Sequence, residues 1–166
     1  KKVAITDMPQ MVALFNGMGG GSAAAIGAME LVRWSAAGQS PGPVPAVLAV
    51  IGALIGAVSL TGSIIAWAKL DGRMDKRYTF PGQQWFNAGV ALAAVILGVM
   101  AISTLGTPWI IAFFIVALAL GILMTLPIGG ADMPVVISLY NAFTGLAVAF
   151  EGYVLQNEAL IIAGMV

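Results

Sequence analysis

The chain has 166 residues, of which 60% are hydrophobic and only 8% are charged, and its seven basic and seven acidic side chains give a formal net charge of zero. Soluble domains carry about 25% charged residues, so the composition excludes an ordinary soluble protein, which would lack the polar surface to cover its core. We expect an all-α fold, a polytopic transmembrane helical bundle in a lipid bilayer, and no nucleic-acid partner. Cysteine and histidine are both absent, which excludes disulfides and removes the side chain best suited to titrate near neutral pH.

Apolar runs of about 20 residues, the length that a spanning helix needs, recur along the chain. They predict five full spans, at Met8–Trp34, Val44–Leu70, Gln84–Thr104, Pro108–Pro127 and Met133–Leu155. Turn-forming or charged segments separate these spans. A sixth run begins near Glu158 and is too short to cross a bilayer. We therefore expect residues 1–166 to be one transmembrane domain within a longer polypeptide.

The first and fifth spans form an internal repeat. DMPQMVALFNGMGGGSAAAIG at residues 7–27 returns as DMPVVISLYNAFTGLAVAFEG at residues 132–152, at a constant offset of 125 residues. Asp7 and Asp132 are read as helix N-caps, each followed by proline in the first turn. Asn16 and Asn141 lie nine residues further along, which places each amide roughly 13–14 Å deeper along its helix. Both amides are thus predicted near the middle of the bilayer, where they need polar partners.

The basic residues indicate the orientation of the chain. If the spans alternate, one side holds all but one of them: Lys1, Lys2, Lys69, Arg73, Lys76 and Arg77, with Arg33 alone on the other side. The positive-inside rule makes the first side cytoplasmic, so we expect the N-terminus and the loop 71–84 in the cytoplasm. Three spans lie between the two repeat helices, so these should run parallel to each other.

Small residues accompany each asparagine at helical spacing. One stripe comprises Ala13, Asn16, Gly20 and Gly27, a second comprises Ser138, Asn141, Gly145 and Gly152, and a third comprises Gly52, Gly56, Ser59 and Ser63, with Thr61 nearby. Such stripes let membrane helices approach closely. The three faces are predicted to enclose a narrow polar core.

Each polar residue has a simpler explanation beside the functional one. An asparagine within the membrane often only fastens helices together, and capping alone would account for both aspartates. A proton path is the functional alternative, in which Asn16 and Asn141 orient water or hydrogen-bond a titratable group from another chain. Asp132, in the loop GGAD, is a candidate contact for a soluble domain that moves. Glu151 is expected to extend to the membrane surface from the end of its helix, and a role in proton exit is the alternative.

Three segments carry a resemblance to a known family: DMPQMVALFNG, GAVSLTGSIIAWAKL and IGGADMPVVISLYNAFTGLAVAFEGYVLQNEALIIAG. They resemble the membrane domain of the beta-type subunit of proton-translocating nicotinamide nucleotide transhydrogenase, over essentially the whole chain. The resemblance implies that proton translocation through this bundle drives hydride transfer from NADH to NADP⁺ in soluble domains outside the membrane. It implies no cofactor within residues 1–166, with NAD(H) and NADP(H) bound in those soluble domains of the full enzyme.

The resemblance also implies partners and a location. The partners are an alpha-type subunit with membrane helices and an NAD(H)-binding domain, the NADP(H)-binding domain of the same subunit, and a second copy of the complex in a homodimer. The location is the bacterial plasma (inner) membrane.

Carried over by position, the resemblance assigns a proton pathway. Asn16 matches a position that is histidine in many relatives and is implicated there in proton transfer. Asn141 and Ser63 match polar channel residues, and Asp132 matches an acidic residue at the cytoplasmic mouth. Because this chain has no histidine, the titratable group is expected from a histidine on a membrane helix of the alpha-type partner. Possible accessory residues are Ser138, Thr61 and Asp7.

Two other classes of function remain open at the level of sequence. A small-solute or ion carrier would use both asparagines as ligands and would not depend on nicotinamide nucleotides. A purely structural anchor would use them only to fasten helices.

Overall fold

The computed structural model describes residues 7–39, 41–74 and 76–166. Helices account for most of these residues, and the described part contains no strand, so the all-α prediction is confirmed. The elements in chain order are α1 (Met8–Ala37), α2 (Pro43–Leu70), α3 (Gln83–Thr104), α4 (Thr107–Thr125), the short 3₁₀ helix η2 (Gly130–Asp132), α5 (Met133–Val154) and α6 (Glu158–Met165). The first five α-helices match the predicted spans to within three residues at each end.

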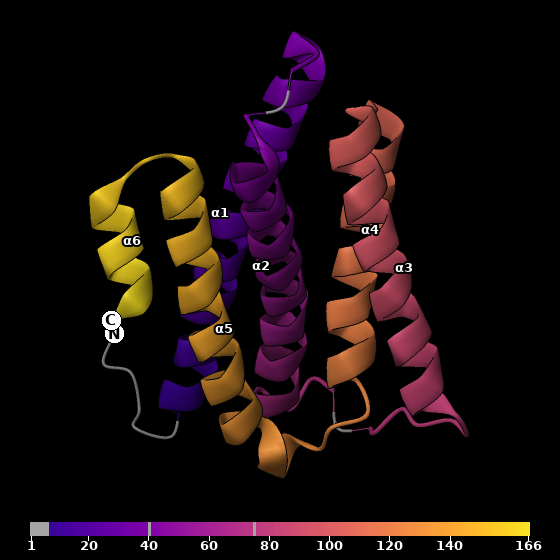
Figure 1. The fold of residues 1–166 in the computed structure, drawn as a ribbon. Coiled ribbons are helices and arrows are strands. Elements are labelled where there is room, and N and C mark those ends of the chain that lie inside the picture. Colours follow the sequence, from indigo (N-terminus) through magenta and orange to yellow (C-terminus); the bar gives the residue numbers. More distant parts are fainter. Residues whose placement is uncertain (1–6, 40, 75) are drawn as a thin grey trace.

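Five of these helices are long and apolar enough to cross a membrane, with η2 counted as the start of the fifth. α6 has only eight residues. The bundle is built around α2, which contacts α1, α4 and α5. In Figure 1, α3 and α4 lie together on one side of α2, and α5 and α6 lie on the other.

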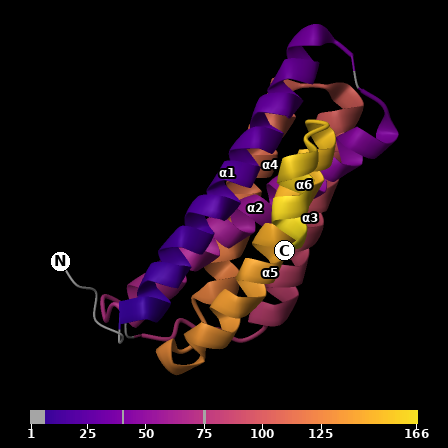
Figure 2. The same ribbon diagram turned by 90° about the vertical axis from the view of Figure 1, so that its left-hand side faces the viewer.

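The repeat helices α1 and α5 run in the same direction, as predicted (Figure 1). They also contact each other along one side of α2. Figure 2 shows α1 extending along the whole length of the bundle, with α6 lying against α5. We call the end at which α1 and α5 begin the Asp132 end, and the opposite end the Glu30 end.

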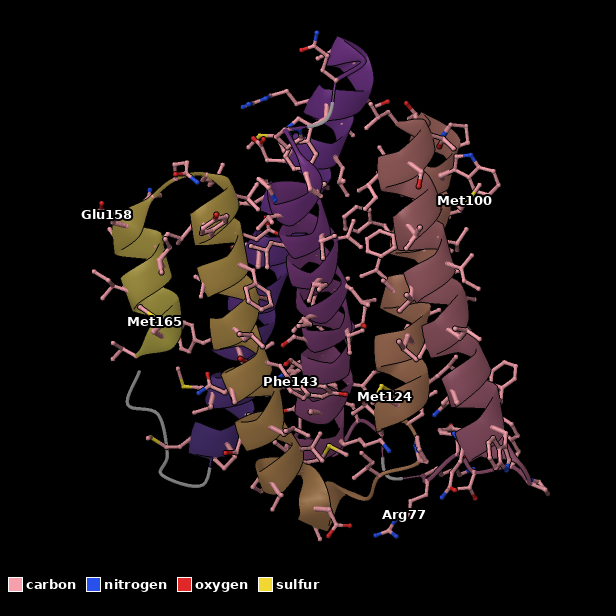
Figure 3. All side chains as sticks on the ribbon, in the orientation of Figure 1. Arg77, Met100, Met124, Phe143, Glu158 and Met165 are labelled. Atoms are coloured by element: carbon pink, nitrogen blue, oxygen red, sulfur yellow. The ribbon has the colours of Figure 1, made fainter. Side chains whose placement is uncertain are left out.

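Most charged side chains of the described residues lie at the Asp132 end. Figure 3 shows Arg77 at this end and Glu158 at the other. Lys69 fixes the connection that leads into α5, because its Nζ donates hydrogen bonds of 2.5 Å to the backbone oxygens of Leu126 and Ile128. Lys1 and Lys2, which entered the orientation prediction, lie outside the described residues.

The two repeat helices begin in the same way, but not by side-chain capping. Asp7 and Asp132 precede α1 and α5 with nearly identical backbone angles, φ −92° and ψ −5° against φ −89° and ψ −6°. These are helical angles, whereas a capping side chain reaches the first free N–H groups from an extended backbone. Neither aspartate side chain accepts the capping hydrogen bond, so that part of the prediction is wrong.

Close packing of α1 on α2 depends on facing glycines. A Cβ atom added to Gly20 would lie 2.9 Å from the backbone oxygen of Gly56, a distance that real Cβ contacts do not reach. Small residues on both helices therefore bring the two backbones together, which is the main source of helix association inside a bilayer. This close approach sets the geometry of the polar residues described next.

Candidate functional site

Four polar side chains from three helices form a hydrogen-bonded cluster within the bundle. Asn16 Nδ2 donates to Ser63 Oγ at 2.8 Å and to Ser59 Oγ at 3.2 Å. Ser59 Oγ in turn lies 2.5 Å from Thr144 Oγ1 of α5. Asn16 is 6% exposed, and both serines are fully buried. We call Asn16, Ser59, Ser63 and Thr144 the Asn16 cluster.

The local sequence explains why this amide meets these serines. A Cβ on Gly17 would lie 3.3 Å from the Ser63 side chain, and one on Gly20 would lie 2.9 Å from that of Ser59. Any larger residue at Gly20 would push α1 away from α2. These two glycines, which follow Asn16 on α1, therefore hold its amide within hydrogen-bond distance of α2.

The carbonyl oxygen of Asn16 remains without a hydrogen-bond partner among the described residues. A buried polar atom of this kind is uncommon, because leaving it unpaired costs about 1–3 kcal/mol. An amide oxygen accepts a hydrogen bond from water, a hydroxyl or a protonated side chain. The Asn16 cluster thus has one acceptor that no described residue satisfies.

A cavity of about 790 Å³ lies beside this cluster, between α1, α5 and α6. Its lining includes Asn16, Ser138, Asn141 and Thr144, together with the glycines Gly19, Gly145 and Gly164. Asn141 and Ser138 are exposed side chains. The structure therefore brings both repeat asparagines to one cavity, Asn16 from a buried position and Asn141 from an exposed one.

The small-residue stripes do not all face the same way. The stripes of α1 and α2 pack on each other, as predicted, through pairs such as Gly20 and Gly56. The stripe of α5 instead faces α6, because a Cβ on Gly145 would meet the backbone of Gly164 at 2.8 Å. Within the Asn16 cluster α5 is represented by Thr144, and Asn141 takes no part in its hydrogen bonds. The prediction of three stripes around one core is wrong for α5.

Thr61 does not join the cluster. Its Oγ1 donates to the backbone oxygen of Leu118 on α4 at 2.9 Å, so it lies on the other face of α2 from Ser63. Two residues along a helix correspond to about 200° of rotation, so Thr61 and Ser63 face different helices although they are close in the sequence.

Asp132 and Asp7 lie at the end of the bundle, away from the Asn16 cluster. Asp132 is exposed, and one of its carboxylate oxygens lies 3.5 Å from an Arg77 guanidinium nitrogen. This pair links the start of α5 to the loop after α2. Asp7 is exposed at the start of α1.

Sequence reasoning missed the role of two residues, Ser59 and Thr144, and the burial of a third, Glu151. Ser59 was placed only in a small-residue stripe, and Thr144 was not singled out. Thr144 lies three residues after Asn141, and its side chain contacts α2 whereas Asn141 lines the cavity. Glu151 was expected to extend to the surface, but its side chain is 0% exposed. Thr144, Ala147 and Glu151 follow each other at spacings of three and four, and this was the available signal that all three share one buried face.

The chain matches known proteins over its full length. The family model described as NAD(P) transhydrogenase beta subunit matches residues 1–166. Two curated relatives, one from Rhodospirillum rubrum and one from a named strain of that species, are both called NAD(P) transhydrogenase subunit beta. Each is 41% identical over 169 residues, which covers 99% of this chain and 36% of the relative. The chain thus spans about a third of the length of these relatives, and it belongs to the NAD(P) transhydrogenase beta subunit family.

Proposed function

We propose that this chain is the proton-translocating membrane part of an NAD(P) transhydrogenase. In this proposal it couples proton movement to hydride transfer from NADH to NADP⁺, which takes place in soluble domains outside residues 1–166. Family membership supports the reaction, and five helices able to span a membrane support the location. No step of the hydride chemistry is assigned to this chain.

One observation carries the proposal. Asn16 is fixed to α2 through its Nδ2, its carbonyl oxygen has no partner among the described residues, and it lines a cavity together with Asn141. A neutral amide does not itself gain or lose a proton in the physiological range. It instead orients a water molecule or a titratable side chain placed beside it.

That titratable side chain is proposed to come from the alpha-type partner. The cavity of about 790 Å³ has room for side chains of a neighbouring helix, and its polar lining comes from both repeat helices. The Asn16 oxygen is buried in this structure, so an imidazole placed there would donate a hydrogen bond to it after the Asn16 side chain turns toward the cavity. Asn141 and Ser138, both exposed, would bind the same group or its water.

The orientation and the coupling region belong to the same proposal. Four of the five basic residues among the described ranges lie at the Asp132 end: Lys69, Arg73, Lys76 and Arg77, with Arg33 at the other end. The positive-inside rule makes the Asp132 end cytoplasmic, in a bacterial plasma membrane. The exposed Asp132, paired loosely with Arg77, would then contact the NADP(H)-binding domain of the same subunit.

Coupling of this kind requires one part of the protein that has two conformations. The bound nucleotide and the bound proton must each favour one of these conformations, so that each changes the affinity for the other by the same factor. We place that part at the start of α5, because α5 carries Asp132 at one end and Thr144 of the Asn16 cluster further along. A shift of α5 would alter both contacts together.

The proposal is tested with the assembled enzyme in proteoliposomes that contain a pH-sensitive dye. With the soluble domains outside, NADPH and NAD⁺ together should acidify the lumen by running the coupled reaction in reverse, and neither nucleotide alone should do so. A protonophore should abolish the signal without stopping hydride transfer. Proton or solute uptake that is equally fast without nucleotides would instead identify a carrier.

The structural-anchor explanation is separated by Asn16→Ala. If Asn16 serves only to fasten α1 to α2, this variant should assemble less well, and the fraction that does assemble should translocate protons at the normal rate per enzyme. The proposal expects the assembled fraction to lose proton movement. Assembly is measured by size-exclusion chromatography of the complex, and proton movement is expressed per assembled complex.

A further inference from the structure

Glu151 of α5 is a carboxyl group buried in the membrane-spanning part of the bundle. Its side chain is fully buried, and neither carboxyl oxygen has a hydrogen-bond partner among the described residues. It lies toward the Glu30 end, seven residues after Thr144 on the same face of α5. The Asn16 cluster does not explain this residue, since about 10 Å of helix separates Glu151 from Thr144.

Glycines on two neighbouring helices form a recess for this carboxyl group. A Cβ added to Gly27 of α1 or to Gly52 of α2 would lie only 2.6 Å from Glu151 Oε1. Both positions belong to the small-residue stripes of their helices. The carboxyl group therefore fits because α1 and α2 each place a glycine opposite it. The recess thus depends on residues of three helices.

No cation neutralises Glu151 within the described residues. On α1 the charged groups nearby are Glu30, which is 4% exposed, and Arg33, which is exposed and pairs with Glu30 at 3.2 Å. The stretch of α2 that faces Glu151 carries no charged residue, and Glu158 of α6 is exposed. An unpaired carboxylate in this setting is strongly disfavoured, whereas the neutral acid is tolerated.

Small apolar residues separate Glu151 from the Asn16 cluster. Ala23 of α1 and Ala147 of α5 are both buried and lie along their helices between the residues of the two levels. No polar side chain of the cluster bonds to Glu151. In this conformation a proton on Glu151 is thus isolated from the cluster, and α1, α2 and α5 must separate slightly before it can pass between them.

We propose that Glu151 is a proton-binding residue in the Glu30-end half of the path, a role that rests on the proposed function. The carboxyl group is fully buried in this conformation, so exchange requires an opening toward the Glu30 end, where the Glu30–Arg33 pair lies. The carboxyl O–H bond then breaks as the proton passes to water, and it re-forms when a proton returns. The step is a simple exchange with water and needs no oxidant or reductant. The packed alanines keep this half of the path closed to the Asn16 cluster.

Infrared difference spectroscopy on the assembled complex tests the inference. A protonated carboxyl group shows a C=O stretching band well separated from that of a carboxylate. The wild-type complex should show this band at neutral pH, and Glu151→Gln should remove it. Glu158→Gln is the matched control, because it makes the same change at an exposed position of the same subunit, and it should leave the band intact.

Proton movement in proteoliposomes provides the second readout. Glu151→Gln should lose nucleotide-driven acidification, and Glu158→Gln should retain it. Glu151→Asp keeps an ionisable group, so it should retain the infrared band and a reduced rate, and it is the variant to measure if Glu151→Gln does not assemble.

A band that persists in Glu151→Gln, or acidification at the wild-type rate in that variant, would overturn the inference while the proposed function stands. Loss of both the infrared band and the rate in Glu151→Asp would also overturn the inference. A structural requirement for the glutamate side chain would then explain the loss of rate without proton binding. Failure of the wild-type complex to acidify the lumen would instead overturn the proposed function.

Discussion

Asn16 Nδ2 lies 2.8 Å from Ser63 Oγ, so the amide of the first repeat helix is anchored to α2. The amide of the second repeat helix, Asn141, lines the same cavity from an exposed position. The two asparagines of the repeat therefore differ in role: one is held rigidly, and the other is open to whatever enters the cavity.

Ser63→Ala should destabilise the bundle modestly. It removes one acceptor of Asn16 Nδ2 while Ser59 remains, and interhelical hydrogen bonds in membranes contribute about 0.6–2 kcal/mol. Unfolding of the purified protein in mixed detergent micelles measures the change. Ser22→Ala is the control, because Ser22 is exposed and bonds only to Met18 of its own helix. Equal effects of the two changes would contradict the anchoring role of Ser63.

Gly20→Ala should destabilise the bundle more strongly, by about 1–3 kcal/mol, because the new Cβ would lie 2.9 Å from Gly56 backbone oxygen and from Ser59 Cβ. The same unfolding assay applies. Gly89→Ala on α3 meets open space, and replacing a glycine within a helix should stabilise it by roughly 0.5–1 kcal/mol. A stable Gly20→Ala variant would show that the packing of α1 on α2 is looser than described.

Asp132→Asn should reduce the response of proton flux to nucleotides with little effect on stability. Asp132 is exposed, and exposed ion pairs contribute little to folding. Arg77→Gln is the matched control, because it breaks the same pair and keeps the carboxylate. If the carboxylate contacts the NADP(H)-binding domain, only Asp132→Asn should impair nucleotide-driven flux in proteoliposomes. Equal impairment in both variants would mean that the ion pair itself is what matters.

Thr61→Val should leave proton movement unchanged. The Thr61 hydroxyl bonds to Leu118 on α4, so its loss affects the contact between α2 and α4 and not the Asn16 cluster. Acidification by the complex in proteoliposomes should match the wild type, with a small decrease in unfolding free energy. Loss of proton movement without loss of stability would place Thr61 on the path after all.

Much of the fold was predictable because hydrophobic length alone specifies a membrane span. The number of spans also predicted the parallel direction of α1 and α5, because three spans lie between them. Asn16 was predictable because it repeats as Asn141 on a small-residue stripe, and Ser63 was assigned through the family resemblance. The stripes that carry these two residues pack together. Such patterns identify a close-packing face without reference to the neighbouring helix.

The orientation of α5 and the burial of Glu151 were not predictable in the same way. A sequence repeat gives two helices the same pattern but not the same neighbours, and α5 turns its Thr144 face to α2 and its Gly145 face to α6. Glu151 lies near a helix end, where an acidic side chain normally reaches solvent. It is buried only because Gly27 and Gly52 on other helices leave room for it.

The most direct test of the account is nucleotide-driven acidification of proteoliposomes by Asn141→Leu, compared with Phe143→Leu. Both variants place leucine at an exposed position of α5, but only Asn141 lines the cavity that it shares with Asn16. We expect Asn141→Leu to assemble, to bind nucleotides and to lose proton movement, and Phe143→Leu to keep it. Acidification at the wild-type rate by Asn141→Leu would contradict a proton path through this cavity.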